Sequence, residues 1–295
     1  MSLVSCISFQ LSGRYADRNR WGVLNGPGDW RGTAEEIIYD EGLLDAWNAK
    51  TVLFTGVSSG IGVETVRVLA LAGATVYGSA RNLEKTRDAL GEEMLRAGQV
   101  HLLVRPCAEG FRGRSDRRND GFELQFGTNH LSHFAPFWYL KDLLLASSTP
   151  AFHSRVVNVA SVAHRYSPVQ FDNNSVEGNY NGWLTCGSSK TANIYMATQV
   201  ERLYGSRGLH GYSVHPGGFT LEGDERAQRY LTKNPQASAT SVYGAVTQEL
   251  EGRGGMYLEG PSIATRACPE DGDAVEYGFG KRIFLIVTVR RDCGS

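Results

Sequence analysis

The chain has 295 residues, 41% of them hydrophobic, and a formal net charge of −1. This length suits one large α/β domain or two small ones, and the near-neutral balance gives no electrostatic reason to expect nucleic acid as a partner. No apolar run approaches the length of a membrane span, and residues 1–10 lack the pattern of a secretory signal. The five cysteines are scattered without a Cys-x-x-Cys pair, which favours free thiols in a reducing, cytoplasmic compartment.

Residues 1–45 form a predicted N-terminal arm. Within it, Thr33-Ala-Glu-Glu36 matches a capping box, so Thr33 is expected to precede a short helix that runs to about Tyr39. Two alternatives stay open for the rest of the arm. It packs on the main domain or extends its entrance, or it is a partly ordered tail.

The stretch that organises the chain is 51–64. An apolar run at 52–54 predicts a buried strand, three glycines follow at Gly56, Gly60 and Gly62, and apolar residues then recur at helical spacing as far as Gly73. Glycines let a ligand approach the backbone, and the helix N-terminus offers unpaired N–H groups to phosphate. The stretch therefore predicts a phosphate-binding turn; the alternative is a tight βα turn without a ligand.

A second strand is predicted at 74–79, and it ends at Arg81. In a dinucleotide site, an acidic residue at this position would accept a hydrogen bond from the ribose 2′-hydroxyl, whereas an arginine suits a 2′-phosphate. Arg81 therefore indicates NADP, unless it is an ordinary surface arginine.

Strands and helices continue to alternate along the chain. The pattern predicts a helix over 83–97, a strand over 100–104, a basic loop over 105–120, a long helix over 122–146, a strand over 155–160, a helix over 186–204, a strand over 209–214, a helix over 238–251 and a last strand over 255–258. Such alternation predicts a Rossmann-like, doubly wound and mostly parallel sheet in one domain over 46–265.

Several motifs in this order make the sequence resemble the short-chain dehydrogenase/reductase family, and it looks most like the retinol-dehydrogenase-like and fungal NADP-dependent reductases. The resemblance covers about 27–265. The motifs are Thr55-Gly-Val-Ser-Ser-Gly-Ile-Gly62, Asn129 in Gly-Thr-Asn-His, Ser161 in Asn-Val-Ala-Ser, Lys190 in Gly-Ser-Ser-Lys and His215-Pro-Gly-Gly-Phe-Thr220.

The resemblance implies two sets of site residues. The catalytic set is Asn129, Ser161, Cys186 and Lys190. The cofactor-binding set is Gly56, Ser58, Ser59, Gly60, Ile61, Gly62, Arg81, Asn82, Lys190, Pro216, Gly217, Phe219 and Thr220.

The family's chemistry is a hydride transfer between NADP and a carbonyl carbon, during which the carbonyl oxygen gains a proton. In the family a tyrosine donates that proton, and a lysine four residues later binds the cofactor ribose. A serine hydroxyl holds the substrate oxygen, and an asparagine supports the proton relay. The spacing of four places tyrosine and lysine on one helix face.

The sequence departs from the family at the proton donor, because Cys186 stands four residues before Lys190 where the tyrosine is expected. A thiol can donate a proton, but its sulfur lies several ångström short of a phenol hydroxyl. Cys186 is therefore either recruited, through a water or a shifted substrate, or inert. Tyr166 and Tyr180 lie nearby in sequence, without a spacing that supports either.

A second departure lies between 97 and 122, where the family has a crossover helix, a fourth strand and an Asn-Asn-Ala-Gly turn. None is readable, so about one βα unit is absent. The fourth strand lies in the centre of the family's sheet, and an empty position there would leave buried amides unpaired. We therefore expect residues 100–104 to take the strand-four position, or the sheet to rearrange.

Residues 266–295 form an atypical C-terminal tail in which 282–290 is strand-like, and this strand is expected to patch the sheet or an interface.

The first functional hypothesis is an NADP-dependent oxidoreductase acting on a carbonyl or alcohol of a small apolar metabolite, in secondary metabolism. The alternatives are a non-redox isomerase-like or cyclase-like descendant and an inactive scaffold. A mis-spliced or decaying gene product also fits these departures. The helices over 122–146 and 186–204 resemble the family's dimer-forming helices, so a homodimer is expected.

Overall fold

A nine-stranded sheet is the centre of the molecule, and its strands follow the order β1-β8-β7-β6-β5-β9-β2-β3-β4. The computed structural model describes residues 11–104, 122–171, 180–217, 231–264 and 286–290. The strands are β1 (Leu11–Ser12), β2 (Lys50–Thr55), β3 (Thr75–Ala80), β4 (Val100–Val104), β5 (Ser154–Val159), β6 (Leu209–His215), β7 (Met256–Glu259), β8 (Ile263–Ala264) and β9 (Ile286–Arg290). Within each group, β2-β3-β4 and β5-β6-β7 are parallel, as a doubly wound α/β fold requires.

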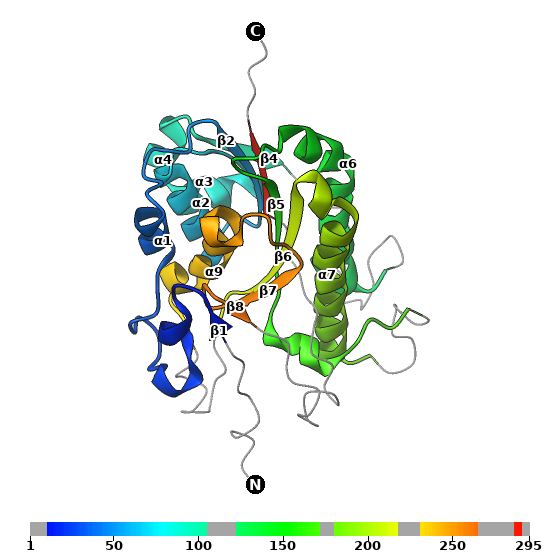
Figure 1. Cartoon of the computed structure of the whole chain (residues 1–295). Helices are drawn as coiled ribbons and strands as arrows, with labels where there is room; N and C mark the ends of the chain where they lie inside the picture. The colour runs from blue at the N-terminus through cyan, green and yellow to red at the C-terminus, as the bar shows by residue number, and fades with distance from the viewer. Residues whose placement is uncertain (1–10, 105–121, 172–179, 218–230, 265–285, 291–295) are drawn as a thin grey trace.

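Helices cover both faces of this sheet (Figure 1). One face carries α1, α2 and α9, which pack on one another, and the other carries α6 and α7. The α-helices are α1 (Ala34–Asp40), α2 (Ile61–Leu71), α3 (Leu83–Leu90), α4 (Glu92–Arg96), α5 (Leu124–Phe126), α6 (Ser132–Ser147), α7 (Gly182–Tyr204) and α9 (Asn234–Val246). Short 3₁₀ turns are η1 (Ala16–Asn19), η2 (Trp21–Val23), η5 (Val162–Tyr166), η6 (Gly205–Arg207) and η7 (Gln248–Leu250), and η4 (Gly127–Leu131) is a π-helical segment.

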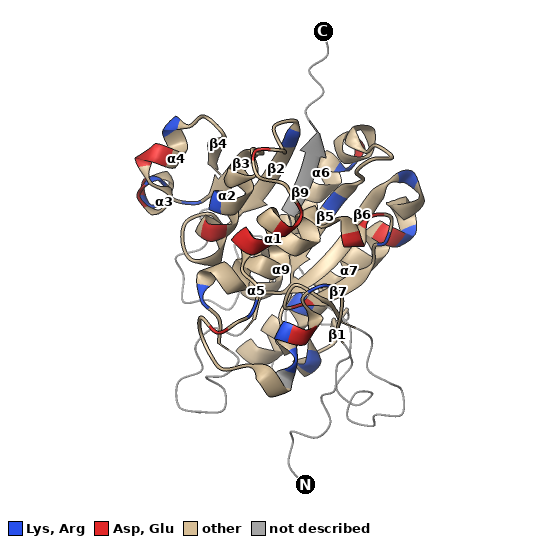
Figure 2. Cartoon of the chain, turned by 60° about the vertical axis from the view of Figure 1, so that its left-hand side comes forward, with Lys and Arg blue, Asp and Glu red and all other residues tan. Residues whose placement is uncertain are grey.

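The larger hydrophobic cluster lies between the sheet and the helices of the first face, and a smaller one lies beneath α6 and α7. Val52, Val76, Val157 and Val214 on four different strands are fully buried in the larger cluster. Their β-branched side chains suit strands that are covered on both faces. The helix α9 carries no charged residue, as its uniform colour in Figure 2 shows, because it is enclosed between α1, α2 and the sheet.

Two arrangements were expected for the centre of the sheet, and the structure shows the second of them, a rearranged sheet. Residues 100–104 form β4, which pairs with β3 at the edge and does not take the strand-four position. Instead β9, from the C-terminal tail, lies between β2 and β5 and runs antiparallel to both (Figure 1). The alternative that the sheet rearranges is therefore confirmed, and the tail patches the sheet. Physically, β9 pairs the amides of two buried parallel strands.

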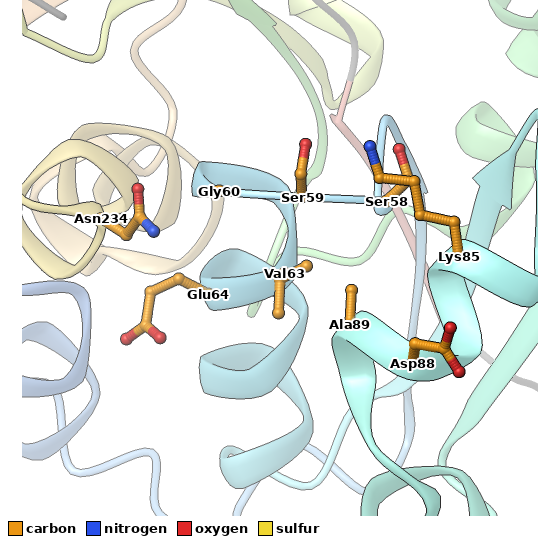
Figure 3. A pocket seen from close by; sticks show the side chains of 9 residues that line it. All are labelled: Ser58, Ser59, Gly60, Val63, Glu64, Lys85, Asp88, Ala89 and Asn234. Carbon is orange, nitrogen blue, oxygen red and sulfur yellow. The ribbon is translucent and has the colours of Figure 1, made fainter.

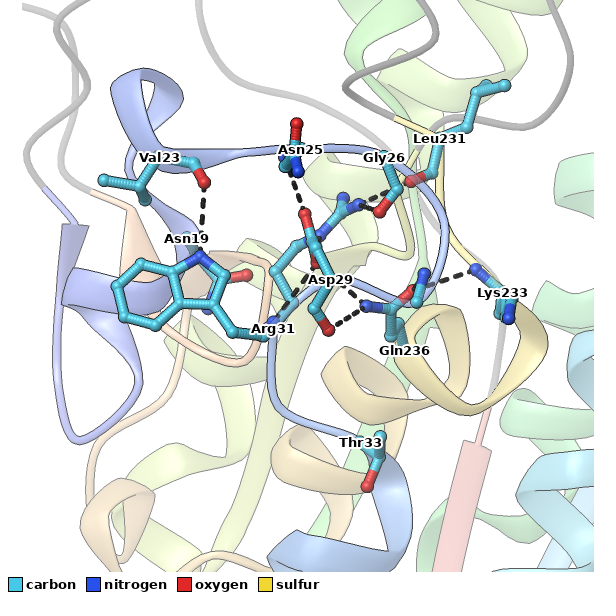
Figure 4. A network of polar contacts seen from close by, with 12 residues as sticks. Asn19, Val23, Asn25, Gly26, Asp29, Arg31, Thr33, Leu231, Lys233 and Gln236 are labelled. Atoms are coloured by element: carbon cyan, nitrogen blue, oxygen red, sulfur yellow. Dashed lines mark hydrogen bonds and ion pairs between the residues drawn. The ribbon is translucent and has the colours of Figure 1, made fainter.

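The N-terminal arm packs on the domain over its described residues. The Thr33 hydroxyl accepts a hydrogen bond from the N–H of Glu36 at 3.2 Å and the Glu36 carboxylate accepts one from the N–H of Thr33 at 2.7 Å, which confirms the capping box. Asp29 pairs with Arg31 at 2.7 Å, and the Gln236 amide of α9 donates to the Asp29 carboxylate at 2.9 Å (Figure 4). This network fixes the start of α9 beside the arm.

Four predicted helices differ in detail, and one of them, expected over 238–251, is α9 over Asn234–Val246 followed by the 3₁₀ turn η7. The helix expected over 83–97 is two helices, α3 and α4, because Gly91 between them has a φ of +80°, which is not helical. The helix over 122–146 is interrupted by the π-helical segment η4. The helix expected from 186 begins four residues earlier, where Asn181 accepts hydrogen bonds from the N–H groups of Trp183 and Leu184.

Among the described residues, no helix combines the length and apolar character needed to cross a bilayer. The predicted basic loop over 105–120 lies outside the described residues.

Candidate cofactor and active site

The glycine turn between β2 and α2 has the geometry expected of a phosphate-binding turn. Gly56 and Gly60 have φ values of +81° and +59°, which disfavour any residue with a side chain. A Cβ at Gly62 would overlap the carbonyl oxygen of Gly56, so the helix begins in close contact with the strand end. No side chain caps the start of α2 at Gly60, so a capping side chain does not occupy the first N–H groups of the helix.

A cavity of about 470 Å³ opens beside this turn (Figure 3). Its volume lies within the range of about 300–1,000 Å³ that is usual for ligand pockets. The lining residues come from the turn, α2, α3 and the start of α9; they are Ser58, Ser59, Gly60, Val63, Glu64, Lys85, Asp88, Ala89 and Asn234. Ser58, Ser59 and Gly60 belong to the predicted cofactor set, and the structure thus brings them to a cavity.

Lys85 is the main residue that sequence reasoning missed. It extends from α3 toward the loop that carries Ser58, and it adds a positive charge to the cavity (Figure 3). The available signal was its position four residues after Arg81, in the first turn of the helix that follows β3. Asn234 carried no such signal, because it reaches the cavity from α9, far away in the sequence.

Arg81 and Asn82 follow the end of β3, as predicted. Arg81 is exposed at this end of the strand. Asn82 is the N-cap of α3, and its side-chain oxygen accepts a hydrogen bond from the N–H of Lys85 at 3.0 Å. Asn82 therefore caps the helix that carries Lys85. The predicted role of Asn82 in cofactor binding did not include this contact.

The acidic groups at the cavity differ in their partners. Glu64 forms an ion pair with Arg67 at 2.7 Å, and Arg67 also pairs with Glu35 of α1 at 2.6 Å. The hydrogen bonds that Arg67 donates to Glu64 raise the pKa of Arg67 above its ordinary value, against the opposing effect of burial. Glu64 and Glu35 thus share one arginine, while Asp88 lines the cavity about one helical turn after Lys85.

The predicted catalytic residues gather where β5 ends. Ser161 caps η5, and its hydroxyl accepts a hydrogen bond from the N–H of Ala163 at 3.5 Å. The helix α7 packs directly on η5, because a Cβ at Gly187 would lie 2.9 Å from the carbonyl oxygen of Ala163. Cys186 precedes this contact, and Lys190 follows one helical turn later on the same face as Cys186.

Burial distinguishes Cys186 from Lys190. Lys190 is only 8% exposed, whereas Cys186 is half-buried and has a free thiol. The short thiol thus stands on the helix face that the family gives to its proton donor, one turn from a nearly enclosed lysine.

Asn129 lies in the π-helical segment η4 and ties that segment to α7. Its side-chain amide donates to the Ser189 hydroxyl at 3.0 Å, and its main-chain carbonyl oxygen accepts a hydrogen bond from the Asn193 side-chain amide at 2.8 Å. These partners flank Lys190 along the chain. A π-helical turn releases backbone carbonyls from the regular ladder, and such turns are frequent at functional sites. The position of Asn129 therefore fits a supporting role near Lys190.

His130 completes this connection. Burial lowers the pKa of His130, although its hydrogen bond with Asn193 opposes the shift. Its Nδ1 lies 2.6 Å from the Asn193 side-chain oxygen, and because that oxygen accepts, Nδ1 carries the hydrogen. The neutral imidazole thus fixes the orientation of the Asn193 amide that binds Asn129.

The two nearby tyrosines have other contacts. The Tyr180 hydroxyl donates to Glu123 at 3.4 Å, and Glu123 is itself buried as the N-cap of α5. The Tyr166 ring packs edge-on against Trp183, with 6.4 Å between the ring centroids. Neither contact involves Cys186 or Lys190.

The loop after β6 is described only in part. Pro216 and Gly217 follow His215 at the end of the strand, and Gly217 has a φ of +97°. Phe219 and Thr220, also predicted to bind the cofactor, lie outside the described residues.

The strand that fills the centre of the sheet also affects the site. Because β9 is antiparallel, its first residue, Ile286, pairs with Phe54 near the glycine turn. The family has the carboxyl end of a parallel strand at this edge. Next to the glycine turn, the sheet therefore has the amino end of β9, where the family has the carboxyl end of its fourth strand.

Comparison with known proteins agrees with this architecture, which is that of a Rossmann-like α/β protein in which β9 takes the central position of the sheet. The short-chain dehydrogenase/reductase prx1 of Penicillium rubens is 41% identical over 294 residues, covering 86% of this chain and 84% of that protein. The oxidoreductase calI of Penicillium decumbens is 32% identical, covering 83% and 86%. Human retinol dehydrogenase 11 is 32% identical, covering 73% and 78%. No family model matches the chain.

Solved structures show the same fold. A protein from Mycobacterium paratuberculosis has a TM-score of 0.54 at 26% identity, covering 77% of this chain and 88% of that one. A short-chain dehydrogenase from Shigella flexneri, complexed with NADP, has a TM-score of 0.53 at 20% identity, covering 74% and 99%. The chain belongs to the short-chain dehydrogenase/reductase family.

Proposed function

We propose that the protein is an NADP-dependent oxidoreductase that interconverts a carbonyl and an alcohol in a small, largely apolar metabolite. The observation that carries the proposal is the cavity beside the glycine turn, which joins Ser58 and Ser59 to the positive charge of Lys85. The Penicillium relatives support a role in fungal secondary metabolism, and the NADP complex of the Shigella flexneri protein supports the choice of cofactor. The unpatterned cysteines favour a cytoplasmic location.

The residues present fit a dinucleotide phosphate. The start of α2 has no side-chain cap, so its first N–H groups would be available to an anion. Arg81, at the end of β3, and Lys85, in the first turn of α3, would together neutralise a 2′-phosphate. Pro216, Gly217 and, further along, Phe219 and Thr220 would hold the nicotinamide end.

A bound dinucleotide supplies or accepts the hydride at the carbonyl carbon. The chain's own residues then manage the oxygen and its proton. Ser161 would donate a hydrogen bond to the substrate oxygen, and Lys190 would bind the cofactor ribose. Cys186 would provide the proton directly or through a water, and Asn129 would hold the backbone around Lys190.

Cofactor preference gives the test of this proposal. We expect calorimetry on protein shown to unfold cooperatively to find tighter binding of NADPH than of NADH. Arg81→Asp should weaken NADPH binding about 10- to 100-fold, since a hydrogen bond to a charged group contributes about 1.5–3 kcal/mol, and should leave NADH binding nearly unchanged.

Arg87→Asp is the matched control, because Arg87 is an exposed arginine of the same helix region that does not line the cavity. It should leave the preference intact. Equal binding of both dinucleotides by the unmodified protein, or no binding by a folded protein, would contradict the proposal.

Cys186 favours a second candidate function. If the thiol cannot protonate the substrate oxygen, the protein would bind the cofactor and act as a non-redox isomerase or cyclase, or as an inactive scaffold. Product formed at a constant NADPH concentration would distinguish the non-redox function from the reductase, which consumes NADPH in step with product.

The same family resemblance supports a homodimer through α6 and α7. The two helices meet through Phe137 and Tyr204, with ring centroids 6.4 Å apart. Their outer faces expose large apolar side chains, which are Phe134, Trp138, Tyr139, Leu143, Tyr195 and Leu203. Such a grouping is typical of a protein–protein contact.

We expect sedimentation velocity to show a dimer that Tyr139→Glu converts to a monomer, because Tyr139 is 83% exposed and a buried unpaired charge opposes association. Tyr39→Glu, at a 54% exposed tyrosine of α1, should leave the dimer intact. A monomer at all micromolar concentrations would rule out this interface.

A further inference from the structure

Two histidines and a glutamate meet at the edge of the sheet opposite the glycine turn. His153 directly precedes β5, His210 is the second residue of β6, and Glu251 follows η7. One possible ligand atom from each lies within 4.8 Å of the other two. Because β2, β5 and β6 run parallel, this edge is separated from the candidate active site by the length of the strands.

Within the cluster, more atoms can accept a hydrogen bond than there are ring hydrogens to donate one. His210 Nδ1 lies 2.9 Å from the Glu201 carboxylate, which accepts, so Nδ1 carries the hydrogen of a neutral His210. His210 Nε2 then presents a lone pair to His153 Nδ1, at 2.9 Å. His153 Nδ1 also lies 2.9 Å from Glu251 Oε1. A single hydrogen on His153 Nδ1 thus faces two acceptors.

We propose that His153 Nδ1, His210 Nε2 and Glu251 Oε1 bind a zinc ion, with water as the fourth ligand. Two imidazole nitrogens and one carboxylate oxygen are donors that zinc prefers, and three protein ligands with one open position form a usual zinc geometry. An ion about 2.0–2.1 Å from each nitrogen needs the two nitrogens roughly 3.3 Å apart. The present separation would widen by only a few tenths of an ångström.

The surrounding residues prepare these three atoms for an ion. The Glu201 carboxylate holds the His210 ring in the tautomer that leaves Nε2 without a hydrogen, as carboxylates commonly do behind zinc-binding histidines. Arg155 donates to the other oxygen of Glu251, Oε2, at 2.9 Å and so turns Oε1 toward the histidines.

The exposure of the cluster allows an ion to enter. His210 is buried, whereas the side chains of His153 and Glu251 are 28% and 20% exposed. An ion bound here would link the starts of β5 and β6 to the segment after η7. Its expected effect is therefore stabilisation of the sheet, without contact with cofactor or substrate.

The test uses the full chain, stripped of metal with a chelator and titrated with zinc chloride in a calorimeter. We expect one zinc ion per chain and a melting temperature that rises with zinc. His153→Ala should abolish both effects, and His153→Gln, which keeps a hydrogen-bonding side chain beside Glu251, should abolish them too. Glu201→Gln should weaken zinc binding by about 10- to 100-fold, as loss of an outer partner typically does.

His101→Ala is the matched control, because His101 is an exposed histidine of β4 that stacks on Tyr77 away from the cluster. It should bind zinc as the unmodified chain does. Cobalt should give a visible absorption spectrum without a thiolate band. No zinc binding, binding unchanged in His153→Ala, or a thiolate band that places the ion on cysteine would overturn the proposal, and none of these readouts depends on cofactor or substrate.

Discussion

A chain that ends at residue 285 is expected to lose cooperative folding. The missing β9 pairs five residues with β2 and three with β5, and both partners are buried parallel strands. Each backbone hydrogen bond contributes about 0.5–1.5 kcal/mol net, and each buried amide left unpaired costs about 1–3 kcal/mol. Because a domain is stable by only about 5–15 kcal/mol, the loss should exceed what the fold can absorb. Thermal melts followed by circular dichroism and dye binding to exposed apolar surface would measure it.

Deletion of residues 291–295 is the control, since it removes the end of the chain and keeps β9. A finer pair of variants acts at Thr288, which pairs with both Val52 and Arg155. Thr288→Pro removes a backbone donor from a central strand and should be strongly destabilising, whereas Thr288→Val keeps that donor and a β-branched residue and should destabilise far less. If the truncated chain melts like the full one, β9 is not part of the folded sheet.

Replacement of Cys186 by tyrosine is expected to raise NADPH-dependent carbonyl reduction by about 10²- to 10⁴-fold, the usual contribution of a positioned general acid. The variant Cys186→Tyr would place a phenol hydroxyl one helical turn before Lys190, beyond the reach of the thiol. Cys186 is half-buried, so the larger ring has access to open space. The measurement is the initial rate of NADPH oxidation across a panel of ketones and aldehydes.

Two variants test the cause of such a gain. Cys186→Phe adds the same ring without a hydroxyl and should stay at the basal rate. Adding Lys190→Ala to Cys186→Tyr should remove the gain, because the lysine supports both the proton donor and the ribose. A gain in Cys186→Phe as large as in Cys186→Tyr would show that packing and not proton donation is responsible. A Cys186→Tyr protein that binds NADPH but gains nothing would locate the defect elsewhere in the site.

Local pattern was sufficient for most of the fold. The strand, turn and helix over 51–73 and the capping box at Thr33 follow from short-range chemistry, and the structure confirms them. The break at Gly91 was missed because a helical period continues across it, although glycine there adopts a positive φ. The sequence left two alternatives for the centre of the sheet, and the structure shows the rearranged one; strand neighbours depend on long-range pairing, which the short apolar run at 100–104 does not encode.

The candidate site was predictable where one motif supplies several residues. Ser58, Ser59 and Gly60 are adjacent in the sequence and line one cavity. Lys85 and Asn234 reach that cavity from other elements, and only the fold brings them together. The tie between Asn129 and Ser189 likewise joins residues 60 positions apart through a π-helical turn that no spacing rule predicts.

The central place of β9 has a consequence for synthesis of the protein. Domains begin to form from the N-terminus while the chain is still being made. Here β2 and β5 are translated long before the strand that pairs with both of them, because β9 follows every other described strand in the chain. Both sheet halves must therefore wait with open edges until β9 has been made. Nascent chains are thus exposed to chaperones and to aggregation until β9 is available, and its contacts with β2, which join residues far apart in the sequence, should form slowly.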